Sequence, residues 1–204
     1  MTPLPERSHV KTPTRVVIAE DEAIIRLDLK ELLEEEGYEV VGETGRGDHA
    51  VDLVRELDPD LAILDIKMPG MDGLTAARHI AADRKAAVLI LTAFSQRDLI
   101  EQARDAGALA YLVKPFQKSD LIPAIEVALG RFSELVALER EVGDLAERLE
   151  ARRIIDRAKG LMMDNHGLTE QQAWRFIQTQ AMNRRLKVHQ IAQMIIDGEL
   201  GPPV

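Results

Sequence analysis

Along the first part of the chain, short apolar runs alternate with longer segments in which apolar residues recur at helical spacing. The runs predict strands at residues 15–19, 38–42, 61–65, 87–91 and 109–113. The helical segments lie near residues 22–36, 48–57, 73–83, 95–106 and 118–131. Strands without polar alternation, each followed by a helix, predict an α/β fold with a doubly wound, five-stranded parallel sheet that helices cover on both faces.

After residue 131 the pattern changes from alternating strands and helices to helices alone. Apolar residues follow a spacing of three and four positions among charged neighbours at Leu135, Leu138, Val142, Leu145 and Leu149. This spacing predicts a coiled-coil helix with a seam of about two heptads. A seam this short is also compatible with a solvated helix that packs one apolar stripe against its own protein.

The C-terminal part is expected to form a small all-α bundle of three helices, the first of which is long. Gly167 should end that helix in a left-handed conformation, and Thr169 begins a capping box with Gln172 at the start of the next helix. The second and third helices carry their apolar residues at helical spacing, with a polar break between them. Trp174 and Phe176 are expected to be packing residues of this bundle.

These patterns divide the chain into a leader, two domains and a tail. The leader is residues 1–13, the α/β domain residues 14–131, the coiled-coil helix with the bundle residues 132–198, and the tail residues 199–204. The leader is proline-containing and lacks an apolar core, so we expect it to be disordered and not a signal peptide. The chain has no cysteine, which excludes disulfides and thiolate metal sites. No apolar stretch approaches the roughly 20 residues that span a bilayer, so a cytoplasmic protein is expected.

Four of the predicted strands end in side chains that suit phosphoryl chemistry. Glu20 and Asp21 follow the first strand, Asp65 ends the third, Thr92 follows the fourth and Lys114 follows the fifth. Because parallel strands present their carboxyl ends at one edge of a sheet, these side chains should converge there. Clustered carboxylates bind a hard cation such as Mg²⁺, while a lysine and a hydroxyl can bind phosphoryl oxygens. The pattern predicts a site where a phosphoryl group is transferred to Asp65.

Each of these residues, taken alone, has a simpler structural explanation. An aspartate after a strand commonly forms an Asx-turn or caps a helix, and a Lys-Pro pair commonly marks a turn. A threonine at a strand end commonly bonds to the backbone. Five such residues at the ends of four strands favour the functional interpretation.

In this order, the residues resemble the receiver domain of bacterial two-component response regulators, a flavodoxin-like domain. The resemblance covers roughly residues 14–131 and implies that Asp65 is the phosphoacceptor. It implies that the ligands of Mg²⁺ are Glu20, Asp21, Asp65 and the backbone carbonyl of Lys67. It also implies that the amine of Lys114 senses the phosphate. The switch residues would be Thr92, through its hydroxyl, and Tyr111, through its aromatic ring.

The receiver resemblance extends to one peptide bond and has one departure among the metal ligands. Lys114–Pro115 resembles a peptide bond that is cis in receiver domains. Glu20 stands where an aspartate is more usual, which lengthens one metal ligand by a methylene group. The departure at Glu20 leaves the charge of the predicted metal site unchanged.

The C-terminal part resembles an ANTAR domain over roughly residues 136–198. The residues that carry the resemblance are 152–162, with Ala-Met at 181–182 and Ile-Ala at 191–192. It implies binding to stem-loops in nascent mRNA and control of transcription antitermination. The charge distribution is compatible with RNA binding by the C-terminal part. The first 150 residues carry 18 basic and 30 acidic side chains, whereas the remaining residues carry 8 basic and 5 acidic side chains. The candidates for RNA contact are Arg152, Arg153, Arg157, Lys159, Arg184, Arg185 and Lys187.

These basic residues could instead form a solvated cationic helix face. Arg152 and Asp156, four positions apart, would then pair on the helix surface. No helix-turn-helix signature with a recognition helix is evident, so duplex DNA is not expected as a partner.

The two resemblances together predict a phosphorylation-switched response regulator and not an enzyme. We expect it to receive its phosphoryl group from a sensor histidine kinase, to bind structured RNA, and to form a homodimer on phosphorylation or RNA binding. The alternative is a receiver whose C-terminal bundle binds a protein. A haloacid-dehalogenase-type phosphatase also uses an aspartate nucleophile, but Lys67 stands where that class requires a second aspartate.

Overall fold

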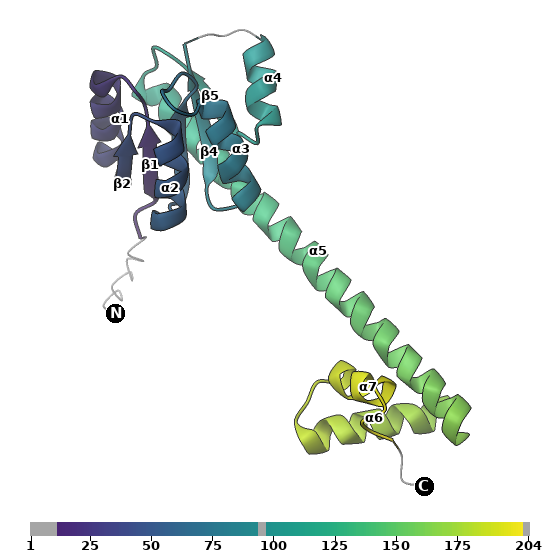
Figure 1. Ribbon diagram of the computed structural model, residues 1–204. Coiled ribbons are helices and arrows are strands. Elements are labelled where there is room, and N and C mark those ends of the chain that lie inside the picture. Colours follow the sequence, from purple (N-terminus) through teal and green to yellow (C-terminus); the bar gives the residue numbers. More distant parts are fainter. Residues whose placement is uncertain (1–11, 94–96, 202–204) are drawn as a thin grey trace, which may run out of the picture. The chain divides into compact units, whose positions relative to one another are not determined.

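The computed structural model describes residues 12–93 and 97–201 (Figure 1). Its single sheet has the strand order β2-β1-β3-β4-β5, and every neighbouring pair is parallel. The strands are β1 Arg15–Ala19, β2 Glu39–Thr44, β3 Leu61–Asp65, β4 Ala87–Thr92 and β5 Ala110–Val113. The predicted doubly wound, five-stranded parallel sheet is confirmed, and its strand order reverses between β1 and β3.

Helices follow each strand and then continue alone to the C-terminal end of the described chain. Five of them are α1 Ala23–Glu35, α2 Gly47–Leu57, α3 Gly73–Asp83, α4 Arg97–Asp105 and α5 Lys118–His166. The last two are α6 Glu170–Arg184 and α7 Val188–Ile196. The predicted helix near 95–106 corresponds to α4, and its first two positions lie outside the described residues, as do most of the predicted leader and the end of the predicted tail.

The sheet has an apolar core on each face because successive strand residues point to opposite sides. On one face, residues such as Val17 and Ala62 pack against α2, α3 and α4. On the other face, Ile18 and Ile63 pack against α1 and the first turns of α5. Both faces are therefore covered, which explains why the central strands have no polar alternation.

Glycines end three of the helices, and one of them is Gly167, as the sequence predicted. Gly37, Gly107 and Gly167 have φ angles of 83°, 86° and 64°. These angles lie in the left-handed region, which a glycine reaches without the steric cost of a Cβ atom. The turns that return the chain from α1 and α4 to the sheet therefore depend on glycine.

The chain divides into two compact units, residues 1–136 and 137–204. Helix α5 is 49 residues long and contributes to both units, so the predicted helix near 118–131 continues into the predicted coiled-coil segment. The seam residues Leu138, Val142, Leu145 and Leu149 are between 51% and 65% exposed. These four of the five seam residues therefore do not pack against their own protein in the described part of the chain, whereas Leu135, at the start of the seam, is half-buried.

The second unit is an all-α bundle of the last turns of α5 with α6 and α7. Its core consists of the buried residues Ala158, Met162, Ala173, Ile177, Ala181, Ile191, Ala192 and Ile195. The predicted capping box is present, because Thr169 and Gln172 bond to each other's backbone N–H at the start of α6. Phe176 packs against the core as expected, but Trp174 does not, and 36% of its surface is exposed.

Among the described residues, none of the helices is sufficiently long and apolar to cross a bilayer. Even α5, at 49 residues, carries charged residues throughout its length.

Candidate functional site

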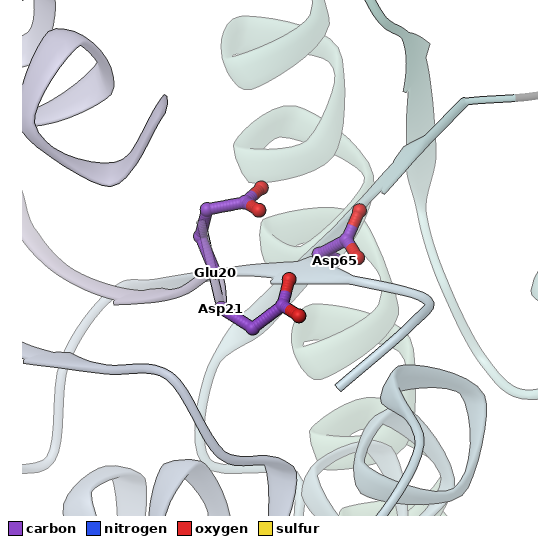
Figure 2. Close-up of side chains that lie close together, drawn as sticks. All are labelled: Glu20, Asp21 and Asp65. Carbon is purple, nitrogen blue, oxygen red and sulfur yellow. The ribbon is translucent and has the colours of Figure 1, made fainter. Parts of the chain in front are cut away.

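Three carboxylates meet at the carboxyl edge of the sheet, where β1 and β3 lie side by side. The register of these parallel strands pairs Ala19 with Leu64, so the residues that follow lie at the same level. One carboxylate oxygen from each of Glu20, Asp21 and Asp65 lies within 4.8 Å of the other two. Figure 2 shows the three side chains gathered at this edge. The sheet topology thus assembles the predicted acidic cluster from two separate strands.

Lys114 places its ammonium group within this cluster from the end of β5. Its Nζ lies 2.6 Å from Oδ1 of Asp65 and 2.5 Å from Oε2 of Glu20. The backbone N–H of Lys114 donates to the carbonyl oxygen of Thr92, which anchors the residue to the end of β4. The Lys114–Pro115 peptide is cis, as the sequence predicted. The side chain of Lys114 is 13% exposed and that of Glu20 is fully buried, so this ion pair is largely shielded from water.

Burial and charge together decide the protonation of these groups. Burial raises the pKa of Glu20 above its ordinary value, and the hydrogen bond from Lys114 only partly offsets this effect. Burial by itself would lower the pKa of Lys114, but the hydrogen bonds to Asp65 and Glu20 raise it above its ordinary value. Lys114 is therefore an ammonium group at neutral pH, held between two acceptors.

A cavity of about 640 Å³ opens beside the carboxylates and is lined by Asp21, Asp65, Lys67, Thr92 and Lys114, among others. Asp21 is exposed, whereas Asp65 and Thr92 are buried, so the cluster is accessible to solvent beside Asp21. A hard cation such as Mg²⁺ prefers oxygen ligands and keeps several of its waters. An oxygen-only donor set with one open side fits such an ion, and these carboxylates could hold it.

Of the remaining residues predicted for this site, Thr92 and Lys67 lie beside the carboxylates and Tyr111 lies at a different cavity. Thr92 ends β4 and is 3% exposed. The backbone N–H of Lys67 donates to Oδ2 of Asp65 at 2.9 Å, whereas Lys114 contacts Oδ1, so each oxygen of this carboxylate has its own partner. Tyr111 is 45% exposed on β5 and lines a different cavity, of about 490 Å³, with residues of α4 and α5.

The loop that follows β3 positions α3 close to Asp65, and this role was not predicted from the sequence. Asp72 caps α3, and its carboxylate accepts from the backbone N–H of Thr75 at 2.9 Å. A Cβ atom at Gly73 would lie 1.9 Å from the carbonyl oxygen of Asp65. Any other residue at this position would push α3 away from Asp65. The Asp72-Gly73 pair, directly before a helical segment, is the signal that could have indicated this close approach.

The candidate RNA-contact residues of the second unit have unequal surroundings. The side chains of Arg152 and Arg153 are 82% and 81% exposed. Arg152 also lies 3.9 Å from Asp156, the ion pair considered in the sequence analysis. Lys159 is only 17% exposed, because its Nζ lies 2.7 Å from Asp156 and 2.8 Å from Glu170. The contact with Asp156 lies within α5, whereas the contact with Glu170 connects α5 with the start of α6.

The other candidates are exposed and make few contacts within the bundle. Arg157 lies on α5, and Arg184, Arg185 and Lys187 lie at the turn between α6 and α7. Arg185 is the left-handed C-cap of α6, with a φ of 56°. That these basic residues contact RNA stays a prediction.

Comparison with known proteins agrees with this architecture. The response regulator receiver domain matches residues 16–126, and the ANTAR domain matches residues 143–196. The transcriptional regulatory protein PdtaR of Mycobacterium tuberculosis is 58% identical over 191 residues, which are 94% of this chain and 93% of that protein. The chemotaxis protein CheY of Bacillus subtilis is 39% identical over 116 residues, which are 56% of this chain and 97% of CheY.

Solved structures show the same fold for the first unit. The signal receiver domain of the response regulator NarL from Mycobacterium tuberculosis superimposes with a TM-score of 0.57 and 29% identity. The match covers 59% of this chain and 98% of that domain. The chain therefore belongs to the family of two-component response regulators, with a receiver domain that is followed by an ANTAR domain.

Proposed function

We propose that the chain is a phosphorylation-switched response regulator that controls transcription antitermination through RNA. A sensor histidine kinase donates a phosphoryl group to Asp65, and the ANTAR domain then binds stem-loops in nascent mRNA. The observation that carries this proposal is the position of Lys114 Nζ, 2.6 Å from Oδ1 of Asp65 and beside two further carboxylates. This arrangement supplies a nucleophile, a cation site and a counter-charge for a phosphoryl group in one place.

The chemistry proposed for the site is transfer of a phosphoryl group to a carboxylate. An oxygen of Asp65 attacks the phosphorus of the phosphohistidine, the P–N bond breaks, and its electron pair stays on the imidazole of the kinase. The proposed ligands of Mg²⁺ are Glu20, Asp21, Asp65 and the backbone carbonyl of Lys67. The ion, when bound, neutralises charge on the transferred oxygens. Lys114 then binds a phosphoryl oxygen, and the backbone N–H of Lys67 keeps Asp65 oriented.

The proposed switch couples this chemistry to the surface of the receiver. The phosphoryl group adds up to about two negative charges at the edge of the sheet. Thr92 and Lys114 are drawn toward it, which lets Tyr111 turn inward. The 45% exposure of Tyr111 supports an outward position before phosphorylation. Such a switch changes the affinity for RNA by the coupling free energy between phosphorylation and RNA binding, commonly about 1–3 kcal/mol.

The second part of the proposal concerns the output. Residues 14–131 act as the receiver, and residues 132–198 act as the coiled-coil helix and RNA-binding domain of a cytoplasmic regulator. The basic residues Arg152, Arg153, Arg157, Arg184, Arg185 and Lys187 are exposed, which supports contacts with phosphates. The exposed seam from Leu138 to Leu149 supports a homodimer that forms on phosphorylation or RNA binding.

The phosphotransfer proposal is tested with radiolabelled acetyl phosphate and the full-length protein. We expect incorporation into the wild type only when Mg²⁺ is present, and none into Asp65→Asn. Asp72→Asn is the matched control, because Asp72 caps α3 without belonging to the carboxylate cluster. Labelling of Asp65→Asn at the wild-type level would place the acceptor elsewhere.

The output proposal is tested by RNA binding of the phosphorylated and unphosphorylated protein. We expect several-fold tighter binding of RNA hairpins after phosphorylation, with an affinity that falls steeply as salt rises. Duplex DNA of the same length should bind more weakly. The alternative output, a protein partner of the bundle, would be favoured if hairpins and duplex DNA bind equally weakly in both phosphorylation states.

A further inference from the structure

The second unit contains a cavity of about 620 Å³ between the last part of α5 and the first turn of α6. Pockets that hold a small organic group commonly have about 300–1,000 Å³, so this one could take a single nucleotide. Its lining is mixed in character and includes Arg148, Arg152, Ile155, Glu170, Gln171 and Trp174. All of these residues belong to the unit formed by residues 137–204.

Trp174 is the aromatic part of this lining. It leaves 36% of its surface exposed, and it is absent from the apolar core that buries its neighbours Ala173 and Ile177. The expectation that Trp174 is a packing residue was wrong, because α6 turns the preceding residue, Ala173, toward the core instead. A partly exposed indole in a cavity provides a flat apolar surface that nothing in the described chain covers completely.

Cationic groups stand on the α5 side of the cavity. Arg148 and Arg152 lie four positions apart on α5, so their side chains project from the same side of the helix. Both are exposed, and Arg152 keeps 82% of its side chain accessible. Lys159 is different, because it is held by Asp156 and Glu170 and so joins the two helices that form the cavity walls. The Lys159–Glu170 ion pair therefore joins the two walls, and the guanidinium groups of Arg148 and Arg152 are accessible to solvent although Arg152 also pairs with Asp156.

We infer that this cavity binds one unpaired base of the RNA loop, stacked on Trp174, with the adjacent phosphates on Arg148 and Arg152. The inference rests on the proposed RNA-binding function and specifies where in the bundle an unpaired base is held. Single-stranded RNA is commonly recognised by bases stacked on aromatic side chains, with arginines on the backbone. Glu170 and Gln171 stand beside the indole and can accept hydrogen bonds from the edge of the base.

The charge pattern favours a nucleotide over an apolar peptide segment. An apolar peptide would place its side chains next to Arg148, Arg152 and Glu170, and so would take these charged groups out of water without offering them hydrogen bonds. A nucleotide presents an aromatic face to Trp174 and a phosphate to the arginines, so each part of the lining meets a complementary group. A base inside a duplex cannot enter, because both of its faces are already stacked.

The test uses the fact that Trp174 is the only tryptophan of the chain, so its fluorescence reports on this cavity alone. The probe is an RNA hairpin that the phosphorylated full-length protein selects from a pool with one stem and a randomised apical loop. A matched duplex has the same stem and no loop. We expect the hairpin to quench the fluorescence of Trp174 and the matched duplex to leave it nearly unchanged.

Binding by variants then separates stacking from general attraction. Trp174→Leu should weaken hairpin binding about 5- to 150-fold, the effect of losing one stacked base. Trp174→Phe should recover much of this loss, and neither variant should change binding of the loopless duplex. Arg148→Ala should weaken binding and reduce the salt slope by somewhat less than one unit. Arg140→Ala is the matched control, because Arg140 lies on the same helix and outside the cavity lining.

Three results would overturn the inference. Equal hairpin affinity of the wild type and Trp174→Leu would show that no base stacks on the indole, while RNA binding itself would stand. A loss of hairpin affinity that parallels a loss of melting temperature would assign Trp174 a structural role. If the wild-type protein selected no hairpin, the proposed RNA-binding function would be disproved, and so would the proposal that this cavity binds a base.

Discussion

Lys114 and Asp65 form an ion pair of 2.6 Å although they follow strands that are not neighbours in the sheet. Strand β4 lies between β3 and β5, and its last residue, Thr92, holds the backbone of Lys114 through a hydrogen bond of 2.8 Å. The lysine side chain thus crosses the end of β4 to reach the acceptor, and it contacts Glu20 beyond it. The order of the strands makes one ammonium group the common partner of two buried carboxylates.

The first prediction concerns this ammonium group. Lys114→Ala leaves Glu20, which is fully buried, and Asp65 without their counter-charge. We expect the free energy of unfolding at neutral pH to fall by roughly 1–3 kcal/mol, the cost of leaving a buried polar group without a partner. Mg²⁺ should stabilise the variant more than it stabilises the wild type, because the ion replaces the lost positive charge. Urea denaturation with and without Mg²⁺ measures both effects.

The control for this variant is Lys118→Ala. Lys118 also contacts two carboxylates, those of Glu35 and Glu36, but its side chain is 42% exposed. Exposed ion pairs contribute little because water screens them. An equal loss of stability in the two variants would contradict the special role of Lys114.

The second prediction concerns the pH dependence of stability. Burial and the hydrogen bond to Glu126, with Oη 3.0 Å from Oε1, raise the pKa of Tyr38 to about 12 from an ordinary value of 10.0. Because the folded state favours the protonated phenol, this contribution to stability is complete below pH 10 and is lost as pH rises toward 12. The stability of the wild type should therefore fall more steeply over this range than that of Tyr38→Phe.

Ultraviolet absorbance of tyrosinate checks the assignment directly. The chain has two tyrosines, and the other is the exposed Tyr111. Tyr38→Phe should lack the absorbance change near pH 12 that comes from Tyr38, and Tyr111→Phe should still show this change. Retention of the high-pH titration in Tyr38→Phe would show that the hydrogen bond to Glu126 is not its source.

The third prediction concerns Lys159, whose sequence context favoured a direct RNA contact. Its contacts with Asp156 and Glu170 hold the pKa of Lys159 above its ordinary value, and the contact with Glu170 connects α5 with α6. We expect Lys159→Ala to lower the melting temperature and RNA affinity together, and Glu170→Gln to lower the melting temperature in the same direction. Arg185→Ala should weaken RNA binding with little change in melting temperature. If Lys159→Ala lost RNA binding at an unchanged melting temperature, Lys159 would be a direct RNA contact after all.

The fourth prediction concerns the seam of α5. Leu145 is 51% exposed within the seam, and a coil of about two heptads is marginal by itself. We expect a mainly monomeric resting protein that dimerises after phosphorylation or RNA binding, and Leu145→Lys should stay monomeric in every condition. Glu147→Lys, on the opposite side of the helix, should dimerise like the wild type. Sedimentation measures these states, and one unchanging mass for the wild type would disprove the coupling.

The sequence by itself determined the local elements of this protein and the type of its chemistry. Strand runs, helical stripes, the capping box of Thr169 and the glycines that end helices depend on neighbours within a few positions, so their patterns are visible in the chain. The reactive residues could be found for the same reason, because each stands directly after a strand. The edge on which they meet followed from the rule that parallel strands end on one side.

Only the tertiary structure decided how these residues contact one another. The bridge from Lys114 to Glu20 and Asp65 depends on strand order, and the approach of Gly73 to Asp65 depends on the position of α3. In the bundle, the exposure of Trp174 and the ion pairs of Lys159 depend on how α5 and α6 are rotated against each other. Periodicity identifies the apolar face of a helix, but a residue at the margin of that face is buried or exposed only by the packing of its neighbours.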